Sequence, residues 1–252
     1  MKNITPTVTI ITVTYNCENC LQETIDSIKS QSYQNYEYII VDGKSNDSTL
    51  DIVNRNSCYI SKWISEPDKG IFDAMNKGID IAKGEWIIFI NAGDYFSDND
   101  SLLRIFNNGN LSEYDIILGR TIYITSHGIV KEKKLFPFYK RRSDYKPMGV
   151  CHQSILVRKE SLRNYRFELE YKICADYKMI KYLYDNGAKV YETDSYIAMA
   201  DISQGFSSSN RKAQFYEVVR ICGITNRSKI YYYYLRSKII SILRKLKHTL
   251  IK

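Results

Sequence analysis

The chain has 252 residues, and its 36 Lys and Arg against 28 Asp and Glu give a formal net charge of +8. With 44% hydrophobic and 25% charged residues the composition is globular, which excludes a disordered, collagen-like or coiled-coil chain. The excess charge is local, because residues 218–252 contain nine basic residues and no acidic one. Residues 1–217 are therefore close to neutral, and a diffuse nucleic-acid-binding surface is not expected.

Neither a membrane-spanning helix nor a secretory signal is expected. No apolar run approaches the ~20 residues that a spanning helix needs, and the N-terminal residues lack the apolar core of a signal peptide. The six cysteines are scattered along a mid-sized chain. We therefore expect a cytoplasmic protein with reduced thiols.

Strand and helix patterns alternate through the first half of the chain. Apolar, β-branched runs predict strands at residues 8–14, 38–41, 60–64 and 86–90, and apolar spacing or capping residues predict helices at 19–30, 46–53 and 70–82. Such alternation predicts a parallel sheet with helices on both faces. Ligands of these sheets bind at the carboxyl ends of the strands.

The second half is less regular. We predict strands at residues 115–118, 120–124 and 154–158 and a helix at 176–186, and we interpret residues 131–147 as a long basic and aromatic loop. A loop of this length without structure of its own is more often functional than not. The chain contains no internal repeat and no linker, so we expect one domain and a tail.

Several familiar motifs are absent. The sequence has no Gly-x-Gly-x-x-Gly, no P-loop and no His-Glu-x-x-His, which disfavours a dinucleotide-binding dehydrogenase, a P-loop enzyme and a histidine-built zinc site. Cys17 and Cys20 form a Cys-x-x-Cys between a strand and a helix, the place of a thioredoxin-like dithiol. Because Glu18 is expected to raise their pKa values, we favour an ordinary turn; a redox function would require a depressed thiol pKa.

Four motifs follow successive predicted strands and contain groups suited to a nucleotide. The first ends in Thr14-Tyr15-Asn16, where a ring can lie against a base, and the second presents Asp42 in a Gly-bearing turn, where a carboxylate can accept hydrogen bonds from a base or ribose. The third is Ser65-Glu66-Pro67-Asp68-Lys69-Gly70-Ile71, and the fourth is Asn91-Ala92-Gly93-Asp94.

In order and spacing these motifs resemble glycosyltransferase family 2, the inverting enzymes of the GT-A fold. The resemblance spans residues 7–98 and continues more thinly to about residue 210. Together with His152-Gln153-Ser154 and Ala175-Asp176-Tyr177, it is similar to the branch that acts in bacterial O-antigen, lipopolysaccharide and capsule assembly. It implies an α/β fold with a Rossmann-like, mostly parallel central sheet and helices on both faces. The catalytic domain would span residues 1–224, with a nucleotide-binding half at about 1–98 and an acceptor half at about 99–224.

The resemblance implies a nucleotide-sugar donor, and it implies roles for particular residues. Thr14 and Tyr15 would line the nucleotide pocket, and Asp42 would face the base. Asp68 would lie beside the donor and Lys69 near its diphosphate.

The fourth motif stands in place of the family's Asp-x-Asp metal motif. Asn91 replaces the first carboxylate and is assigned to donor binding, which leaves Asp94 to bind Mn²⁺ or Mg²⁺. Asp176 matches the family's catalytic base. His152 and Gln153 are assigned to the acceptor, although a histidine that enters a strand is also often structural. Inversion at a sugar carbon needs a carboxylate that deprotonates the acceptor hydroxyl and a cation at the departing diphosphate.

The tail, residues 225–252, is predicted to form a basic amphipathic helix from Leu235 onward. Its apolar side suits the surface of an anionic membrane, with the tyrosines of residues 231–234 at headgroup depth; packing on the body is the alternative. The resemblance implies a polyprenyl-diphosphate-linked glycan as acceptor. We therefore expect a peripheral protein on the inner face of the cell membrane.

Two other functions stay open. A nucleotidyltransferase uses a similar sheet and metal, but it usually has a Gly-rich loop after the first strand, and Tyr15-Asn16-Cys17-Glu18 is not one. A nucleic-acid binder would use the basic, Tyr-rich tail, and the near-neutral body disfavours it.

Overall fold

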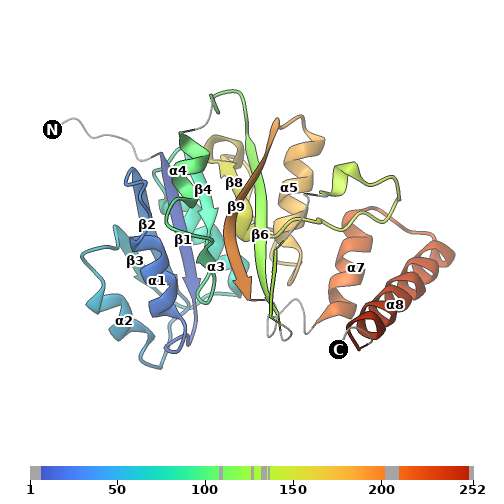
Figure 1. The fold of residues 1–252 in the computed structure, drawn as a ribbon, viewed down its shortest axis with the longest axis horizontal. Coiled ribbons are helices and arrows are strands. Elements are labelled where there is room, and N and C mark those ends of the chain that lie inside the picture. Colours follow the sequence, from blue (N-terminus) through green and yellow to red (C-terminus); the bar gives the residue numbers. More distant parts are fainter. Residues whose placement is uncertain are drawn as a thin grey trace.

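The computed structural model describes residues 7–107, 110–125, 128–131, 135, 137–201 and 210–249, with side chains as far as Ile239. Its centre is a nine-stranded sheet of order β3-β2-β1-β4-β8-β6-β9-β5, in which β7 pairs with β6 (Figure 1). The strands are β1 (Val8–Thr14), β2 (Tyr36–Asp42), β3 (Lys62–Ser65), β4 (Trp86–Phe89), β5 (Tyr95–Phe96), β6 (Ile116–Thr125), β7 (Gly128–Lys131), β8 (Ile155–Arg158) and β9 (Val190–Asp201). Strands β5, β7 and β8 run against the other six, so the predicted mostly parallel α/β fold is confirmed.

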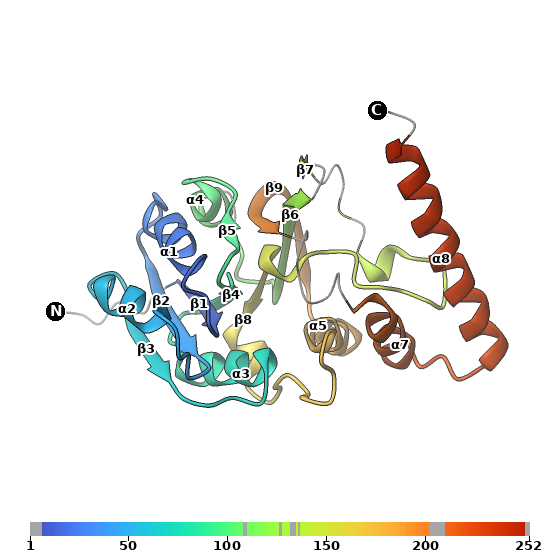
Figure 2. The ribbon, with the colours of Figure 1, turned by 90° about the horizontal axis from the view of Figure 1, so that it is seen from below.

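Helices cover both faces of this sheet, as the alternating pattern predicted (Figure 2). They are α1 (Leu21–Lys29), α2 (Thr49–Arg55), α3 (Ile71–Ile81), α4 (Ser101–Phe106), α5 (Ala175–Asp185) and α7 (Arg211–Ile221). The last helix, α8 (Arg227–Thr249), lies beyond α7, away from the sheet (Figure 2). Strand β1 serves both faces because successive side chains point to opposite sides. Ile10 packs in the core that includes α1, α2 and α4, whereas Ile11 packs in the core that includes α3, α5 and α7.

The first three predicted strands end side by side. In the parallel register Thr14 lies opposite Asp42, and Asp42 lies opposite Ser65. On the other side of β1, the Ala92 amide donates to the Val13 carbonyl at 3.3 Å. The loops that follow β1, β2, β3 and β4 therefore meet at one edge of the sheet, where a ligand is expected.

The second half of the sheet differs from the prediction. The two strands predicted at 115–118 and 120–124 are one long strand, β6, with an irregular register near Gly119. A Cβ at Gly119 would lie 2.3 Å from Ile197 Cδ1, so glycine lets β9 pass close by rather than ending the strand. Strand β9 was not predicted, because its polar run from Glu192 to Ser195 hides the strand pattern.

The predicted long loop at 131–147 is partly structured. Residues 132–134 and 136 lie outside the described residues, but Phe138–Lys140 form a short 3₁₀ turn with Phe138 buried. Tyr139 stacks on Tyr184 of α5 with ring centroids 4.6 Å apart. The described part of this segment therefore packs on the body.

The tail helix begins eight residues earlier than predicted, and the tyrosine run lies inside it. Tyr233 stacks on Tyr145 and Tyr234 meets Phe215 edge-on, so these two rings pack on the body. Tyr231 is 65% exposed and points away from such contacts. The apolar positions from Ile242 onward lie outside the described side chains. In the part of the chain that the structure covers, no helix is long and apolar enough to cross a membrane.

Candidate active site

The loops after β1, β2 and β3 bring Tyr15, Gly43 and Asp68 together. A Cβ on Gly43 would lie 2.4 Å from Asp68 Oδ2 and 3.3 Å from the Tyr15 ring, so the glycine lets these two side chains approach the turn closely. The Tyr15 side chain is 60% exposed. Asp68 accepts the Gly70 amide at 2.8 Å. Lys69 is exposed, and its amide donates to Asp73 at 2.9 Å.

Asp42 is fully buried at the end of β2. Its carboxylate accepts hydrogen bonds from the Ser45 amide at 3.0 Å, from the Ser45 hydroxyl and from the Ser65 hydroxyl at 2.6 Å. The turn is thus organised by Asp42 itself, which is the ordinary role of such an aspartate. Thr14, next to it on β1, is also buried.

A second group of predicted residues forms a chain of contacts. His152 Nδ1 lies 3.2 Å from Asp176 Oδ2, and His152 Nε2 lies 3.1 Å from Asn91 Nδ2. The topology explains this proximity: β8 runs antiparallel to β4, so the turn that opens β8, His152–Ser154, lies beside the end of β4. Asp176 occupies the first turn of α5, where its Oδ1 accepts the Tyr177 amide at 2.7 Å.

One arrangement of hydrogens satisfies both contacts of His152. With Asn91 Nδ2 donating to Nε2 of a neutral ring, the ring proton lies on Nδ1, facing Asp176. Burial lowers the pKa of His152, but the hydrogen bond and charge of Asp176 and the charge of Asp94 outweigh it and leave that pKa raised.

Asp94 lies within this group and contacts Gln153. Its Oδ2 accepts a hydrogen bond from Gln153 Nε2 at 2.7 Å, and both side chains are buried. Burial raises the pKa of Asp94 to about 6, partly offset by the Gln153 hydrogen bond and the charge of His152. The two residues assigned to the acceptor thus contact the candidate base, Asp176, and the candidate metal ligand, Asp94. Acceptor contact itself stays a prediction.

The residues present fit a divalent cation that takes most of its ligands from elsewhere. The Asn91 Oδ1 atom is buried and has no hydrogen-bond partner within the described part of the chain, so an uncommitted oxygen lies on the same short turn as Asp94. Among the described residues no cluster of three or more His, Cys, Asp or Glu side chains is arranged to hold a metal. Asn91 and Asp94 would therefore supply two oxygens of the kind that Mg²⁺ prefers, with ligand oxygens and water completing the shell.

One supporting residue escaped the sequence patterns. Glu217 of α7 accepts hydrogen bonds from the amides of Lys172, Ile173 and Cys174 at 2.8, 3.0 and 2.7 Å. It therefore anchors the segment that leads into Asp176. A lone glutamate in a helix, more than forty residues away in the chain, carries no sequence signal for this contact.

Asn76 and Gly78 of α3 have packing roles in the structure. The Asn76 side chain exchanges two hydrogen bonds with the backbone of Phe167. A Cβ on Gly78 would lie 2.7 Å from Ile11 Cγ2, so glycine permits α3 to approach β1 closely.

The Cys-x-x-Cys pair forms the turn between β1 and α1. A hydrogen bond from the Cys20 thiol lowers the pKa of Cys17 to about 6, and the same bond raises the pKa of Cys20. The Glu18 carboxylate accepts the Ser48 amide at 3.0 Å, and the group that lowers the pKa of Cys17 is the Cys20 thiol. The pair also forms the ordinary turn favoured from the sequence, because the Cys17 carbonyl accepts the Cys20 amide at 3.1 Å.

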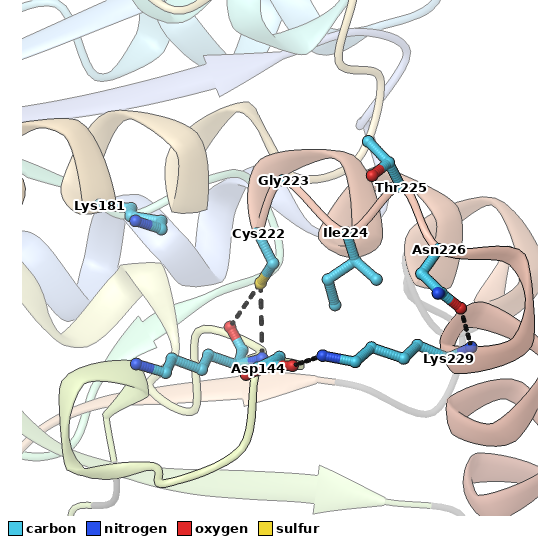
Figure 3. Close-up of a pocket in the computed structure, with 9 residues that line it drawn as sticks. Asp144, Lys181, Cys222, Gly223, Ile224, Thr225, Asn226 and Lys229 are labelled. Carbon is cyan, nitrogen blue, oxygen red and sulfur yellow. Dashed lines mark hydrogen bonds and ion pairs between the residues drawn. The ribbon is translucent and has the colours of Figure 1, made fainter.

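A hollow of about 380 Å³ lies elsewhere, between α5, the 141–150 segment and the turn joining α7 to α8 (Figure 3). Asp144 pairs with Lys229 across it at 2.6 Å, which joins α8 to the body. None of the predicted site residues lines it. The chemistry-bearing residues gather instead at the strand ends.

The family is decided by a direct comparison. The sequence profile of glycosyl transferase family 2 matches residues 9–172, about two thirds of the chain. The chain belongs to glycosyltransferase family 2. It is 30% identical over 195 residues to the PGL/p-HBAD biosynthesis glycosyltransferase of Mycobacterium bovis, covering 73% of this chain and 72% of that protein. It is 35% identical over 132 residues to the poly(ribitol-phosphate) beta-glucosyltransferase of Bacillus spizizenii, covering 49% of this chain and 20% of the other.

Solved structures agree in fold with this family 2 glycosyltransferase. S. aureus TarS residues 1–349, in complex with UDP-GlcNAc, superpose with a TM-score of 0.68 at 20% identity, covering 86% of this chain and 65% of that one. The mannosyltransferase PcManGT of Pyrobaculum calidifontis, in complex with GDP-Man and Mn²⁺, superposes with a TM-score of 0.66 at 19% identity, covering 86% and 65%. The longer TarS structure extends well beyond the match, which covers 39% of it.

Proposed function

We propose that this enzyme is an inverting glycosyltransferase that moves a sugar from a UDP-sugar to a hydroxyl of a polyprenyl-diphosphate-linked glycan during surface polysaccharide assembly. The observation that carries the proposal is the contact chain from Asn91 through His152 to Asp176, with Asp94 and Gln153 beside it. It unites a candidate base and a candidate cation ligand at the edge where Tyr15 and Asp68 meet.

Asp176 is the base in this proposal. Its carboxylate takes the proton of the acceptor hydroxyl while that oxygen attacks the anomeric carbon from the face opposite the diphosphate. His152 Nδ1–H donates to Oδ2 of Asp176 and holds the carboxylate in one orientation. A divalent cation at Asn91 and Asp94 would neutralise charge on the departing diphosphate. Tyr15 and Asp68 would receive the base and ribose, with Lys69 near the diphosphate. Asp42, which is fully buried, would shape this pocket through its hydrogen bonds with Ser45 and Ser65.

The named relatives and neighbours set the range of donors and acceptors to test. TarS holds UDP-GlcNAc and PcManGT holds GDP-Man with Mn²⁺, so both bases occur in this fold. One relative acts in PGL/p-HBAD biosynthesis and another on poly(ribitol-phosphate), which supports a surface-polymer or glycolipid acceptor. Peripheral attachment to the inner face of the cell membrane, through α8, belongs to the same proposal.

The test uses the purified full chain with UDP- and GDP-sugars and added Mn²⁺ or Mg²⁺. We expect a UDP-sugar to raise the melting temperature and to release UDP slowly without acceptor. Asp176→Asn should lower turnover by about 10²- to 10⁴-fold while the donor still stabilises the protein. Asp185→Asn, on the same helix and paired with Lys181, is the matched control and should keep full activity.

Each other outcome separates the alternatives. Full turnover in both Asp176→Asn and Asp94→Ala contradicts the mechanism. Pyrophosphate release from a nucleoside triphosphate would favour a nucleotidyltransferase instead. Steeply salt-dependent binding of DNA or RNA through the tail would favour the nucleic-acid binder.

A further inference from the structure

The turn between β1 and α1 holds its two cysteines at a spacing suited to a disulfide. The Cys17 carbonyl accepts the amides of Cys20 at 3.1 Å and Leu21 at 3.0 Å. A turn closed in this way keeps its first and fourth Cα atoms within about 7 Å, and disulfides join Cα atoms about 4.4–6.8 Å apart. Both thiols are free and partly exposed, so a small reagent can reach them.

The two thiols are chemically unequal. The Cys20 thiol lies beside Cys17, with its Sγ 3.8 Å from the Cys17 carbonyl oxygen, and it lowers the pKa of Cys17, whereas burial and the charge of Asp47 oppose this effect. Hydrogen bonding with Cys17 and burial raise the pKa of Cys20, and the charges of Glu23 and Asp94 add to the rise. The pair therefore has one nucleophilic sulfur, at Cys17, and one protonated partner beside it.

We propose that Cys17 and Cys20 are a reactive dithiol, a modification site at the carboxyl end of β1 that hydroperoxides close into a disulfide. In the first step the Cys17 thiolate attacks the peroxide, the O–O bond breaks, a sulfenic acid forms and the departing oxygen takes a proton. In the second step the Cys20 sulfur displaces hydroxide from that sulfenic acid, and water leaves with the Cys20 proton. Two thiols and one hydroperoxide thus become one disulfide, one alcohol (or water) and one water.

The site lies against the loops that form the candidate active site. The Cys17 amide donates to Thr49 Oγ1 at 2.8 Å, in the segment that follows Asp42. The Cys20 sulfur lies next to Gly93, on the turn between Asn91 and Asp94. A Cβ added to Gly93 would lie 3.7 Å from that sulfur. Closing the disulfide therefore alters a turn shared by the donor and metal residues. Only this consequence rests on the proposed function; the thiol chemistry does not.

The first experiment counts thiols in the full chain. The reduced protein has six cysteines, and after stoichiometric hydrogen peroxide we expect four thiols on denaturation, with a peptide disulfide between positions 17 and 20. Cys17→Ser and Cys20→Ser should not form it. Cys58→Ser, at an exposed and unpaired position, is the matched control; it should still form the disulfide between positions 17 and 20 and keep three of its five thiols. Six remaining thiols, or a disulfide elsewhere, would overturn the proposal.

The second experiment measures alkylation of Cys17 by iodoacetamide against pH. The rate should have its midpoint near pH 6 in the wild type, because the thiolate is the reacting form. Cys20→Ala removes the donor and should move the midpoint above about pH 8, near an ordinary cysteine. Cys20→Ser retains a hydroxyl donor and should move it less. Equal midpoints in the wild type and Cys20→Ala would show that the two thiols do not interact, which contradicts the proposal whether or not transfer activity is found.

Discussion

His152 contacts Asp176 with one ring nitrogen and Asn91 with the other, so its role can be separated by substitution. An asparagine places its amide nitrogen near the position of Nδ1 and can still donate to Asp176, whereas a glutamine places its amide near Nε2. We expect His152→Asn to keep most of kcat. His152→Gln and His152→Ala should lose about 10- to 100-fold in kcat, since a misplaced base costs rate, with little change in donor KM.

The readout that decides is the split between kcat and KM. If His152 only contacts the acceptor, acceptor KM should rise in every variant. In that case the kcat of His152→Asn should not exceed that of His152→Gln or His152→Ala. Equal losses in the asparagine and glutamine variants would contradict the positioning role.

The sequence motifs alone indicated several residues of the candidate site. The ordered motifs marked Tyr15, Asp68, Asp94 and Asp176, and the structure brings Asn91, Asp94, His152, Gln153 and Asp176 into one network. What no residue pattern indicated is the partner of each group. The committed hydrogen bonds of Asp42 and the uncommitted oxygen of Asn91 depend on distances across the sheet edge.

At the scale of elements, α7 and α5 cooperate through Glu217. The carboxylate spans three backbone amides just before α5 begins. Charged hydrogen bonds of this kind contribute roughly 1.5–3 kcal/mol each where partners would otherwise be unpaired. Glu217→Ala should lower the free energy of unfolding by about 2–3 kcal/mol and lower kcat through movement of Asp176, as chemical denaturation and turnover would show.

A surface glutamate gives the comparison for this variant. Glu113, 75% exposed in its loose pairing with Lys189, should tolerate alanine within about 0.5 kcal/mol. If Glu217→Ala resembles Glu113→Ala in both measurements, the anchoring role is wrong.

The approach of α3 to β1 yields a prediction of packing. Gly78→Ala places a methyl 2.7 Å from Ile11 Cγ2, and Ile11 is fully buried, so neither side can move freely. Overpacking costs about 1–3 kcal/mol, which exceeds the gain of about 1 kcal/mol in helix propensity. The melting temperature should fall. A rise would mean that the helix and strand separate at little cost.

At the scale of the whole molecule, α8 packs on the rest of the protein with part of its surface and leaves apolar side chains exposed on another part. Its first turns are held by the ion pair of Lys229 with Asp144 (Figure 3) and by the stacking of Tyr233 on Tyr145. Tyr232, Leu235 and Ile239 remain 58%, 41% and 56% exposed. Apolar side chains left open on a basic helix suit an anionic lipid surface.

We expect the full chain to sediment with vesicles of phosphatidylglycerol and much less with phosphatidylcholine alone. Leu235→Glu with Ile239→Glu removes apolar contact and adds charge repulsion, so binding should weaken at least about tenfold. Val130→Glu alters an equally open residue on β7, 50% exposed, and should bind as wild type. Unchanged binding of the double variant would mean that this helix face meets water, not lipid.

The sequence by itself determined the class of fold and the family, and it marked the candidate site residues, because buried parallel strands and short polar turns leave contiguous patterns. The first four strands were predicted within a few residues for the same reason, whereas the tail helix begins eight residues earlier than predicted and α4 and α7 were not predicted. Only the tertiary structure decided which residues that are far apart in the chain come into contact. Strand β9 is defined by its pairing with β6, although residues 192–195 are polar. His152 meets Asp176 because β8 runs antiparallel to β4 and begins beside the end of that strand. Such contacts join residues that are close in space but far apart in the chain, and they leave no periodic pattern in the sequence. The same holds for the net charge of +8. The sequence alone places the basic residues in the tail, whereas the packing of α8 on the body decides which face of that helix stays exposed.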